Sequence, residues 1–182
     1  MKFLSLIIAF TAMINIANSQ TSKSFYDFKA TTLEGKPFDL SSLKGKKVLV
    51  VNTASKCGYT PQYAQLEALY KKYSGKDFVI IGFPANNFMS QEPGTNGEIR
   101  EFCSTKFGVT FPMMSKISVK GKNIDPLYSW LTNKDENGVM DAPVKWNFQK
   151  FMIDENGKLI GMVPPTDVPD CDKIINWIEN KK

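Results

Sequence analysis

The sequence contains no histidine, and this absence excludes several kinds of active site. A serine or cysteine nucleophile activated by a neighbouring imidazole cannot exist here, and neither can a zinc or copper site with a histidine ligand. An activated nucleophile must therefore rely on hydrogen bonds, lysines or the positive end of a helix dipole. We expect neither a metal nor any other cofactor.

Long apolar runs are also missing. The run over residues 3–14 is too short to span a bilayer comfortably, since a transmembrane helix takes roughly 20 apolar residues. It follows the basic start at Lys2 and precedes small residues around Ser19, which is the pattern of a secretory signal peptide. We expect cleavage after Ser19, export to the periplasm or the extracellular space, and one domain over residues 20–182. The alternative is a retained membrane anchor or a buried helix.

Charge of one sign is not concentrated anywhere. The formal net charge is +5, and the basic residues are scattered along the chain rather than gathered in a stripe. A nucleic-acid-binding surface needs such a stripe, so nucleic acid is not an expected partner. Cysteine is scarce as well: the chain has three, and an odd number in an exported protein leaves one without an internal partner.

Apolar periodicity and turn residues predict an ordered series of elements. The series is a hairpin within residues 25–40, a buried strand over 47–52, a helix opened by the capping hydroxyl of Thr60 and by Pro61, a buried strand over 77–83, a helix over 97–107 and a helix from Asp125. Strands over 148–153 and 159–163 follow, joined by a turn over 154–157 that ends in Gly157, and the last element is a helix over 170–180. This order predicts an α/β thioredoxin-like fold, with a central mixed sheet flanked by helices, an N-terminal β-hairpin and a parallel first pair of core strands.

Cys57 follows the first buried strand and precedes the helix that opens at Pro61. Reactive groups in open α/β sheets gather beyond the carboxyl ends of strands. A thiol at this point also faces free N–H groups and the positive end of a helix dipole, which favour the thiolate. The placement predicts a reactive cysteine; the alternative is an inert, buried thiol.

The residues that follow Cys57 narrow the chemistry. Residues 57–60 have the position of a Cys-x-x-Cys redox motif, but Thr60 stands where the second cysteine would be. An ordinary dithiol–disulfide oxidoreductase would therefore lack its resolving thiol. A single thiolate suits attack on a peroxide O–O bond, which yields a sulfenic acid.

Three segments of the chain resemble the glutathione peroxidase family. They are NTASKCGYTPQY at residues 52–63, GFPANNF with QEPGTN at 82–88 and 91–96, and KWNFQKF at 145–151. They occur in the family's order and with similar spacing across nearly all of residues 25–180. The resemblance implies a peroxidase that acts on hydrogen peroxide or organic hydroperoxides. It also implies that Cys57 is the peroxidatic residue and that Gln91, Trp146 and Asn147 surround its sulfur.

The resemblance also implies a role for Cys103, which sits near the end of a predicted helix. Family members that use thioredoxin carry their resolving cysteine in a similar segment, so a thioredoxin-like protein is the expected reductant and glutathione the alternative. Ala85 replaces a cysteine found in many relatives. The short stretch over residues 131–145 lacks the extra segment of tetrameric, glutathione-using relatives, which favours a monomer. Cys103 could instead be a buried helix residue, and Cys171 has no assigned role.

Two other functions remain open at this point. A redox sensor would use the same Cys57 and Cys103 but would pass oxidation to a partner protein without sustained turnover. A peroxiredoxin would share the chemistry, yet its Thr/Ser-x-x-Cys pattern is broken here by Ala54.

Overall fold

The computed structural model describes residues 23–180 of the chain, so the predicted signal peptide and its cleavage point lie outside the described residues. In chain order the elements are the 3-10 turn η1 (Phe25–Asp27), strands β1 (Lys29–Thr31) and β2 (Pro37–Asp39), the 3-10 turn η2 (Leu40–Leu43), strand β3 (Lys47–Thr53), helix α1 (Gln62–Tyr73), strand β4 (Phe78–Pro84), helices α2 (Asn96–Phe107), α3 (Pro126–Thr132) and α4 (Lys134–Asn137), strands β5 (Lys150–Ile153) and β6 (Leu159–Val163), and helix α5 (Asp172–Ile178).

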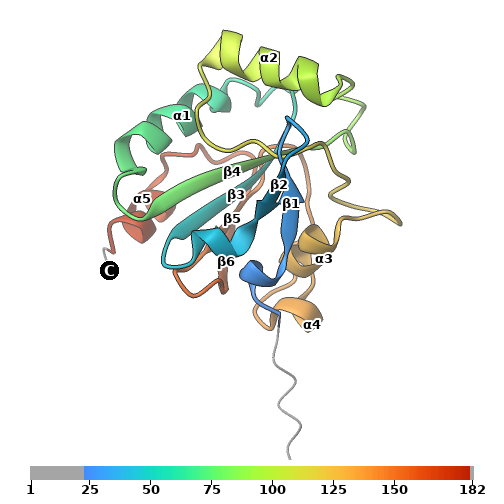
Figure 1. Cartoon of the computed structure of the whole chain (residues 1–182). Helices are drawn as coiled ribbons and strands as arrows, with labels where there is room; N and C mark the ends of the chain where they lie inside the picture. The colour runs from blue at the N-terminus through green and yellow to red at the C-terminus, as the bar shows by residue number, and fades with distance from the viewer. Residues whose placement is uncertain (1–22, 181–182) are drawn as a thin grey trace, which may run out of the picture.

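The central sheet is mixed and has the strand order β4-β3-β5-β6. β3 and β4 run parallel because α1 carries the chain back from the end of one strand to the start of the next. β5 and β6 form an antiparallel hairpin that adds to the other edge of β3. Figure 1 shows α1 and α5 on one side of this sheet and α3 with the β1–β2 hairpin on the other. The predicted mixed sheet and its parallel first pair are confirmed.

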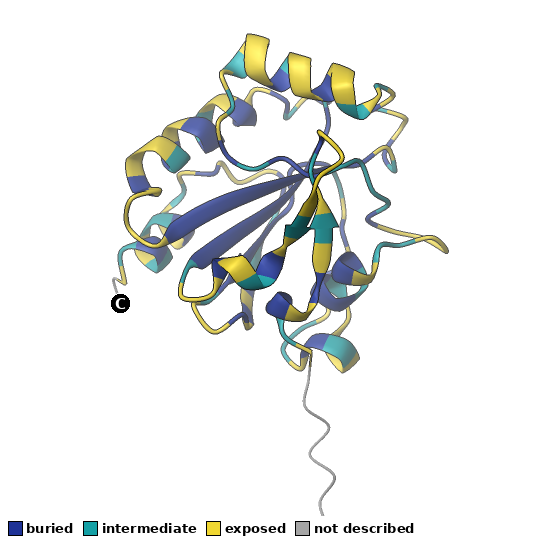
Figure 2. Cartoon of the chain, in the orientation of Figure 1, coloured by how far each residue is buried: buried dark blue, intermediate teal, exposed yellow. Residues whose placement is uncertain are grey.

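Both faces of the sheet are buried, which explains why β3 and β4 read as continuous apolar runs. Successive side chains of β3 point to opposite faces, so Val48 and Val50 pack with residues from η1, η2 and α3. Leu49 and Val51 pack instead with residues from α1, α2 and α5. Figure 2 shows β3 and β4 dark blue along their length, whereas α2 presents a mostly exposed outer surface.

The element boundaries differ from the prediction mainly at the ends of elements. The predicted N-terminal hairpin is confirmed but short, with three residues in each of β1 and β2, and η1 precedes it. The one-turn helix α4 was not predicted, because its four residues carry no apolar periodicity. Among residues 23–180 no helix combines the length and the apolar content needed to cross a membrane.

Candidate active site

Cys57 lies in a tight turn that joins the end of β3 to α1. The Thr60 hydroxyl holds this turn closed: it accepts the Cys57 backbone N–H at 3.0 Å and donates to the Ala54 carbonyl at 2.9 Å. The predicted capping role of Thr60 is therefore wrong, because its hydroxyl serves the turn. α1 begins at Gln62 with no side-chain cap, and the first helical N–H groups bond to backbone carbonyls three residues back.

The Cys57 side chain is close to the surface but largely covered, with 7% of its area exposed. The Tyr59 backbone N–H points at its sulfur, with 3.4 Å between the nitrogen and Sγ. A hydrogen bond donated to sulfur stabilises negative charge there, as does the nearby entrance of a helix. The turn thus directs a backbone hydrogen-bond donor at the sulfur.

The predicted partners Gln91 and Asn147 are in direct contact. The Asn147 side-chain amide donates to Gln91 Oε1 at 3.0 Å, which links the loop after β4 to the segment before β5. The Gln91 carbonyl also accepts the Lys56 backbone N–H at 3.0 Å. Gln91 therefore joins the residue next to Cys57 and the side chain of Asn147.

Trp146 lies at the same edge of the sheet. Its carbonyl accepts a hydrogen bond from the Asn52 side chain at 3.0 Å, and its ring packs against Phe88 with 5.3 Å between centroids. Within the described part of the chain, the hydrogen bond to the Cys57 sulfur comes from Tyr59 and not from the predicted partners. The structure places Gln91, Trp146 and Asn147 at the edge of the sheet that carries Cys57. None of the three donates a hydrogen bond to Cys57 Sγ.

The backbone is strained on both sides of this pair of amides. Met89 and Ser90, directly before Gln91, have φ values of 50° and 51°, and Phe148, directly after Asn147, has a φ of 68°. Such left-handed conformations are costly for residues other than glycine and gather at functional sites. Their position here supports the assignment of this edge as the site.

A buried carboxyl beside the site was not predicted. Glu92 is wholly buried, and its Oε1 accepts the Ser55 hydroxyl at 2.6 Å. Burial raises the pKa of the Glu92 carboxyl, while the Ser55 hydrogen bonds and the charge of Lys116 act in the opposite direction. Both Ser55 and Glu92 fall within the segments that resemble the family, so a signal was present, but neither residue type alone indicated a contact between them.

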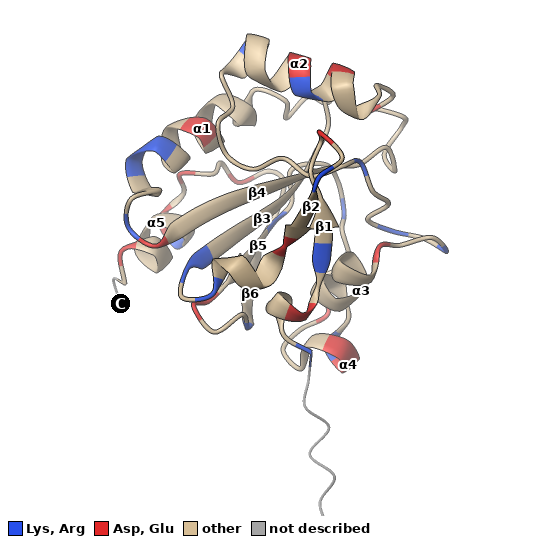
Figure 3. Cartoon of the chain, viewed as in Figure 1, with Lys and Arg blue, Asp and Glu red and all other residues tan. Residues whose placement is uncertain are grey.

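A hollow of about 370 Å³ lies next to this contact, between the Cys57 turn and α2. Its wall is mixed in character and is formed by Ser55, Lys56, Glu92, Glu98, Ile99 and Phe102, together with the backbone at Pro93 and Gly94. Its charged residues are of both signs, with Lys56 beside Glu92 and Glu98, and Figure 3 shows acidic and basic segments scattered over the molecule.

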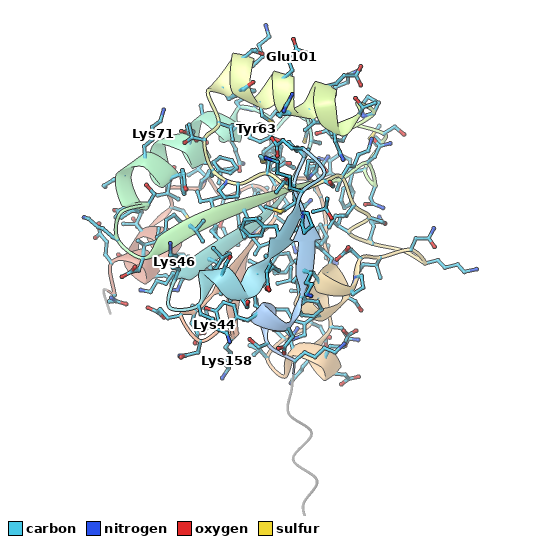
Figure 4. The ribbon with its side chains drawn as sticks, in the orientation of Figure 1. Lys44, Lys46, Tyr63, Lys71, Glu101 and Lys158 are labelled. Carbon is cyan, nitrogen blue, oxygen red and sulfur yellow. The ribbon has the colours of Figure 1, made fainter. Side chains whose placement is uncertain are left out.

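Cys103 lies in α2, as predicted, and its side chain faces inward with 3% of its area exposed. Burial raises the pKa of the Cys103 thiol to about 11, although the neighbouring Tyr63 hydroxyl acts to lower it. Figure 4 shows Tyr63 between α1 and α2, whereas Glu101 of α2 points outward. Cys57, Cys103 and Cys171 are all free thiols.

Comparisons with known proteins agree with this geometry. The model of the family described as glutathione peroxidase matches residues 25–132. "Glutathione peroxidase-like peroxiredoxin 2" of Saccharomyces cerevisiae is 52% identical over 137 residues, which cover 75% of this chain and 85% of the relative. The crystal structure of Trgpx in apo form is 44% identical, with a TM-score of 0.68 and coverage of 87% of this chain and 97% of that one.

A more distant structure shows the fold alone. A thiol:disulfide interchange protein of the thioredoxin family from Chlorobium tepidum TLS is 22% identical, has a TM-score of 0.57 and covers 83% of this chain and 92% of its own. The predicted thioredoxin-like fold is thereby confirmed.

Proposed function

The chain belongs to the glutathione peroxidase family and is a thiol peroxidase that reduces hydroperoxides, and we propose that Cys57 is the thiol that attacks the peroxide. The observation that carries this assignment is the Cys57 turn. It places the sulfur beyond the end of β3, at the entrance of α1, with the Tyr59 N–H directed at it.

The first step transfers one oxygen atom from the peroxide to sulfur. The Cys57 thiolate attacks the O–O bond, the sulfur becomes a sulfenic acid, and the alkoxide or hydroxide that leaves takes a proton from solvent to become alcohol or water. Gln91, Trp146 and Asn147 would orient the peroxide and donate hydrogen bonds to the leaving oxygen. The bond between the Gln91 and Asn147 amides supports this role, because it fixes both groups while the Gln91 Nε2 hydrogens stay available.

The second step is resolution by Cys103. Its thiol displaces hydroxide from the Cys57 sulfenic acid, the disulfide forms, and the thiol proton leaves with the hydroxide as water. α2 has to open for this step, because Cys103 is buried against α1. The packing of α2 favours such opening: of its twelve residues only Ile99 and Cys103 are buried, and hollows of about 370 and 280 Å³ flank it.

A dithiol protein then reduces the disulfide, and we propose a thioredoxin-like protein rather than glutathione for this role. Cys103 supports this choice. If Cys103 resolves the sulfenic acid, the reductant meets a disulfide within the protein, and a dithiol protein reduces such a disulfide by thiol–disulfide exchange. We further propose that the protein is exported and works as a monomer. Cell fractionation and analytical ultracentrifugation test these two points.

The catalytic assignment is tested by peroxide turnover with cysteine variants. Hydrogen peroxide or an alkyl hydroperoxide is mixed with the protein and either thioredoxin, thioredoxin reductase and NADPH, or glutathione, glutathione reductase and NADPH. We expect Cys57→Ser to lower turnover by roughly a thousandfold or more with both reductants. Cys103→Ser should abolish turnover with thioredoxin while Cys57 is still oxidised once. Cys171→Ser serves as the matched control and should retain turnover.

A different experimental result would rule out each part of the proposal. Turnover that survives Cys57→Ser would rule out the peroxidatic assignment. Unchanged thioredoxin-linked turnover in Cys103→Ser would rule out the two-cysteine cycle alone. Wild-type protein that consumes about one equivalent of peroxide and then stops, even with both reductants present, would favour a redox sensor.

A further inference from the structure

The end of α2 that carries Cys103 is closed by the Cys103 carbonyl itself. Gly108 ends the helix in the left-handed conformation, with a φ of 60°, and its N–H bonds back into the last turn. The Val109 N–H then bonds to the Cys103 carbonyl at 3.2 Å. Unwinding this last turn would therefore release the Cys103 backbone from the end of the helix.

A carboxylate of α1 holds the segment immediately after this closure. Glu67 Oε2 accepts the Thr110 backbone N–H at 2.8 Å, and Oε1 accepts the Thr110 hydroxyl at 2.6 Å. Glu67 is itself buried, and Lys71 lies 3.3 Å from Oε1 with its side chain mostly in solvent. Figure 4 shows Lys71 pointing outward from α1. Glu67 thus accepts two hydrogen bonds from Thr110, just beyond the end of α2.

Glu67 stands one helical turn beyond Tyr63, the residue of α1 beneath Cys103. The Tyr63 ring packs against Phe107 of α2 with 5.4 Å between centroids, so Tyr63 and Glu67 hold the last turn of α2 and its continuation. The other end of α2 is fixed separately. Thr95 and Glu98 form a capping box there, and Lys116 donates to the Gly94 carbonyl at 2.6 Å.

We propose that Glu67 is a positioning residue for the resolving step: its contact with Thr110 keeps α2 closed over Cys103, and release of that contact sets how often Cys103 can reach Cys57. This inference rests on the proposed two-cysteine cycle. The reaction that it controls joins the Cys57 sulfenic acid and the Cys103 thiol into a disulfide and one water molecule.

Hollows flank both ends of α2, so the polar contacts distinguish the two ends. The first turn is held by its capping box and by the Lys116 contact, whereas the segment after the last turn is held by Glu67. Hydrogen bonds to a charged group are stronger than those between neutral groups. The Glu67 carboxylate therefore supplies a charge-assisted polar contact that opposes the movement of α2.

The test separates the two chemical steps in a Thr110→Val variant. This change removes the hydroxyl bond to Glu67 but leaves the backbone N–H bond and the size of the side chain. Reduced protein is mixed with one equivalent of hydrogen peroxide, quenched with acid and alkylated, and the sulfenic acid and the disulfide are followed by intact mass. If opening precedes resolution, loss of one charge-assisted bond should speed disulfide formation roughly tenfold. The rate of Cys57 oxidation should not change.

Three further measurements make the test specific. Thr110→Ser restores the hydroxyl and should return the disulfide rate to that of the wild type. Thr105→Val removes a hydroxyl that bonds within α2 to the Glu101 carbonyl at 2.7 Å, on the exposed side, and should have no effect. Without peroxide, alkylation of Cys103 in Thr110→Val should accelerate by a similar factor. If Thr110→Val does not fold, Glu67→Gln keeps the size of the side chain, removes its charge and should also accelerate resolution.

An unchanged or slower disulfide rate in Thr110→Val, with normal Cys57 oxidation, would overturn the role of Glu67 and leave the two-cysteine cycle intact. Equal acceleration in Thr105→Val would also overturn it, because any loosening of α2 would then suffice. Wild-type protein that forms the sulfenic acid but never the Cys57–Cys103 disulfide would overturn both the cycle and this inference.

Discussion

The reactivity of single side chains in this protein depends on their surroundings more than on the residue type. Cys57 and Cys103 belong to the same apolar cluster, yet Cys57 accepts an N–H from Tyr59 whereas burial holds Cys103 as a protonated thiol. The contrast supports the proposed roles, in which Cys57 attacks the peroxide and Cys103 resolves the product later. Neither property follows from cysteine as such, because both arise from the turns and helices that carry the two sulfurs.

Lys150 shows the same dependence on surroundings and leads to a stability prediction. Its side chain has 0% of its area exposed, and its Nζ donates to the Asp167 carbonyl at 2.5 Å. Burial lowers the Lys150 pKa to about 8 from 10.5, although the charges of Cys171 and Asp167 oppose the shift. Between these two values the unfolded chain binds more protons than the folded one, so this group makes stability rise with pH from about 8 to 10.5.

We therefore expect Lys150→Met to raise the free energy of unfolding at pH 7 by about 1–2 kcal/mol, because the ammonium no longer has to be buried. The advantage should shrink toward pH 10, where the wild-type amine is neutral in the folded protein. Urea unfolding of both proteins at the two pH values measures this difference. A variant that is less stable than the wild type at pH 7 would contradict the prediction.

At the scale of elements, the β5–β6 turn is held by a glycine that packs against the start of the domain. Gly157 has a φ of 79°, and a Cβ there would lie 2.4 Å from Ser24 Oγ and 2.6 Å from the Tyr26 ring. Gly35, in the β1–β2 turn, has nearly the same φ of 78° but no atom within 4 Å of such a Cβ. A comparison of alanine substitutions at the two glycines therefore separates the cost of backbone strain from the cost of a steric clash.

We expect Gly157→Ala to destabilise the protein by about 2–4 kcal/mol and Gly35→Ala by about 1 kcal/mol. The smaller value reflects the left-handed backbone alone, and the difference reflects the clash with η1. Chemical denaturation of the two variants gives both numbers. Similar losses in both would show that η1 moves aside at little cost.

At the scale of the whole molecule, the site depends on three connections that meet at one edge of the sheet. The turn after β3 carries Cys57, the loop after β4 carries Gln91, and the segment before β5 carries Asn147. In the proposed cycle the sheet itself need not change, since the part that would move is α2 at its margin (Figure 1). Oxidation should therefore loosen one element and leave the core as it is.

Hydrogen–deuterium exchange tests this separation. In the peroxide-oxidised protein, backbone amides of residues 103–110 should exchange roughly tenfold or more faster than in the reduced protein, because the last turn of α2 has opened. Amides of β3 and β4 should keep their protection. Uniform acceleration over the chain would indicate general destabilisation, and no change over 103–110 would mean that the disulfide forms without unwinding α2.

The sequence was sufficient for the elements and their order, because periodicity and turn residues are local signals. β3 and β4 were recognisable as strands covered on both faces, and Gly157 as part of a turn. The resemblance of three segments to one family was sufficient for the membership, which is confirmed, and for proposing Cys57 as the reactive thiol, which stays a prediction. The capping role of Thr60 failed as a prediction, because the same hydroxyl could serve either the helix or the turn before it.

Contacts between distant residues were decided by the tertiary structure. The hydrogen bond from Asn147 to Gln91 joins residues 56 positions apart, and the contact of Glu67 with Thr110 joins residues 43 positions apart. Folding sets such distances through the packing of whole elements, and no local pattern encodes them. The sequence alone thus determined the fold and pointed to the thiol that we propose reacts, whereas the burial of Cys103 and the contact of Glu67 with Thr110 exist only once α1 and α2 have packed together.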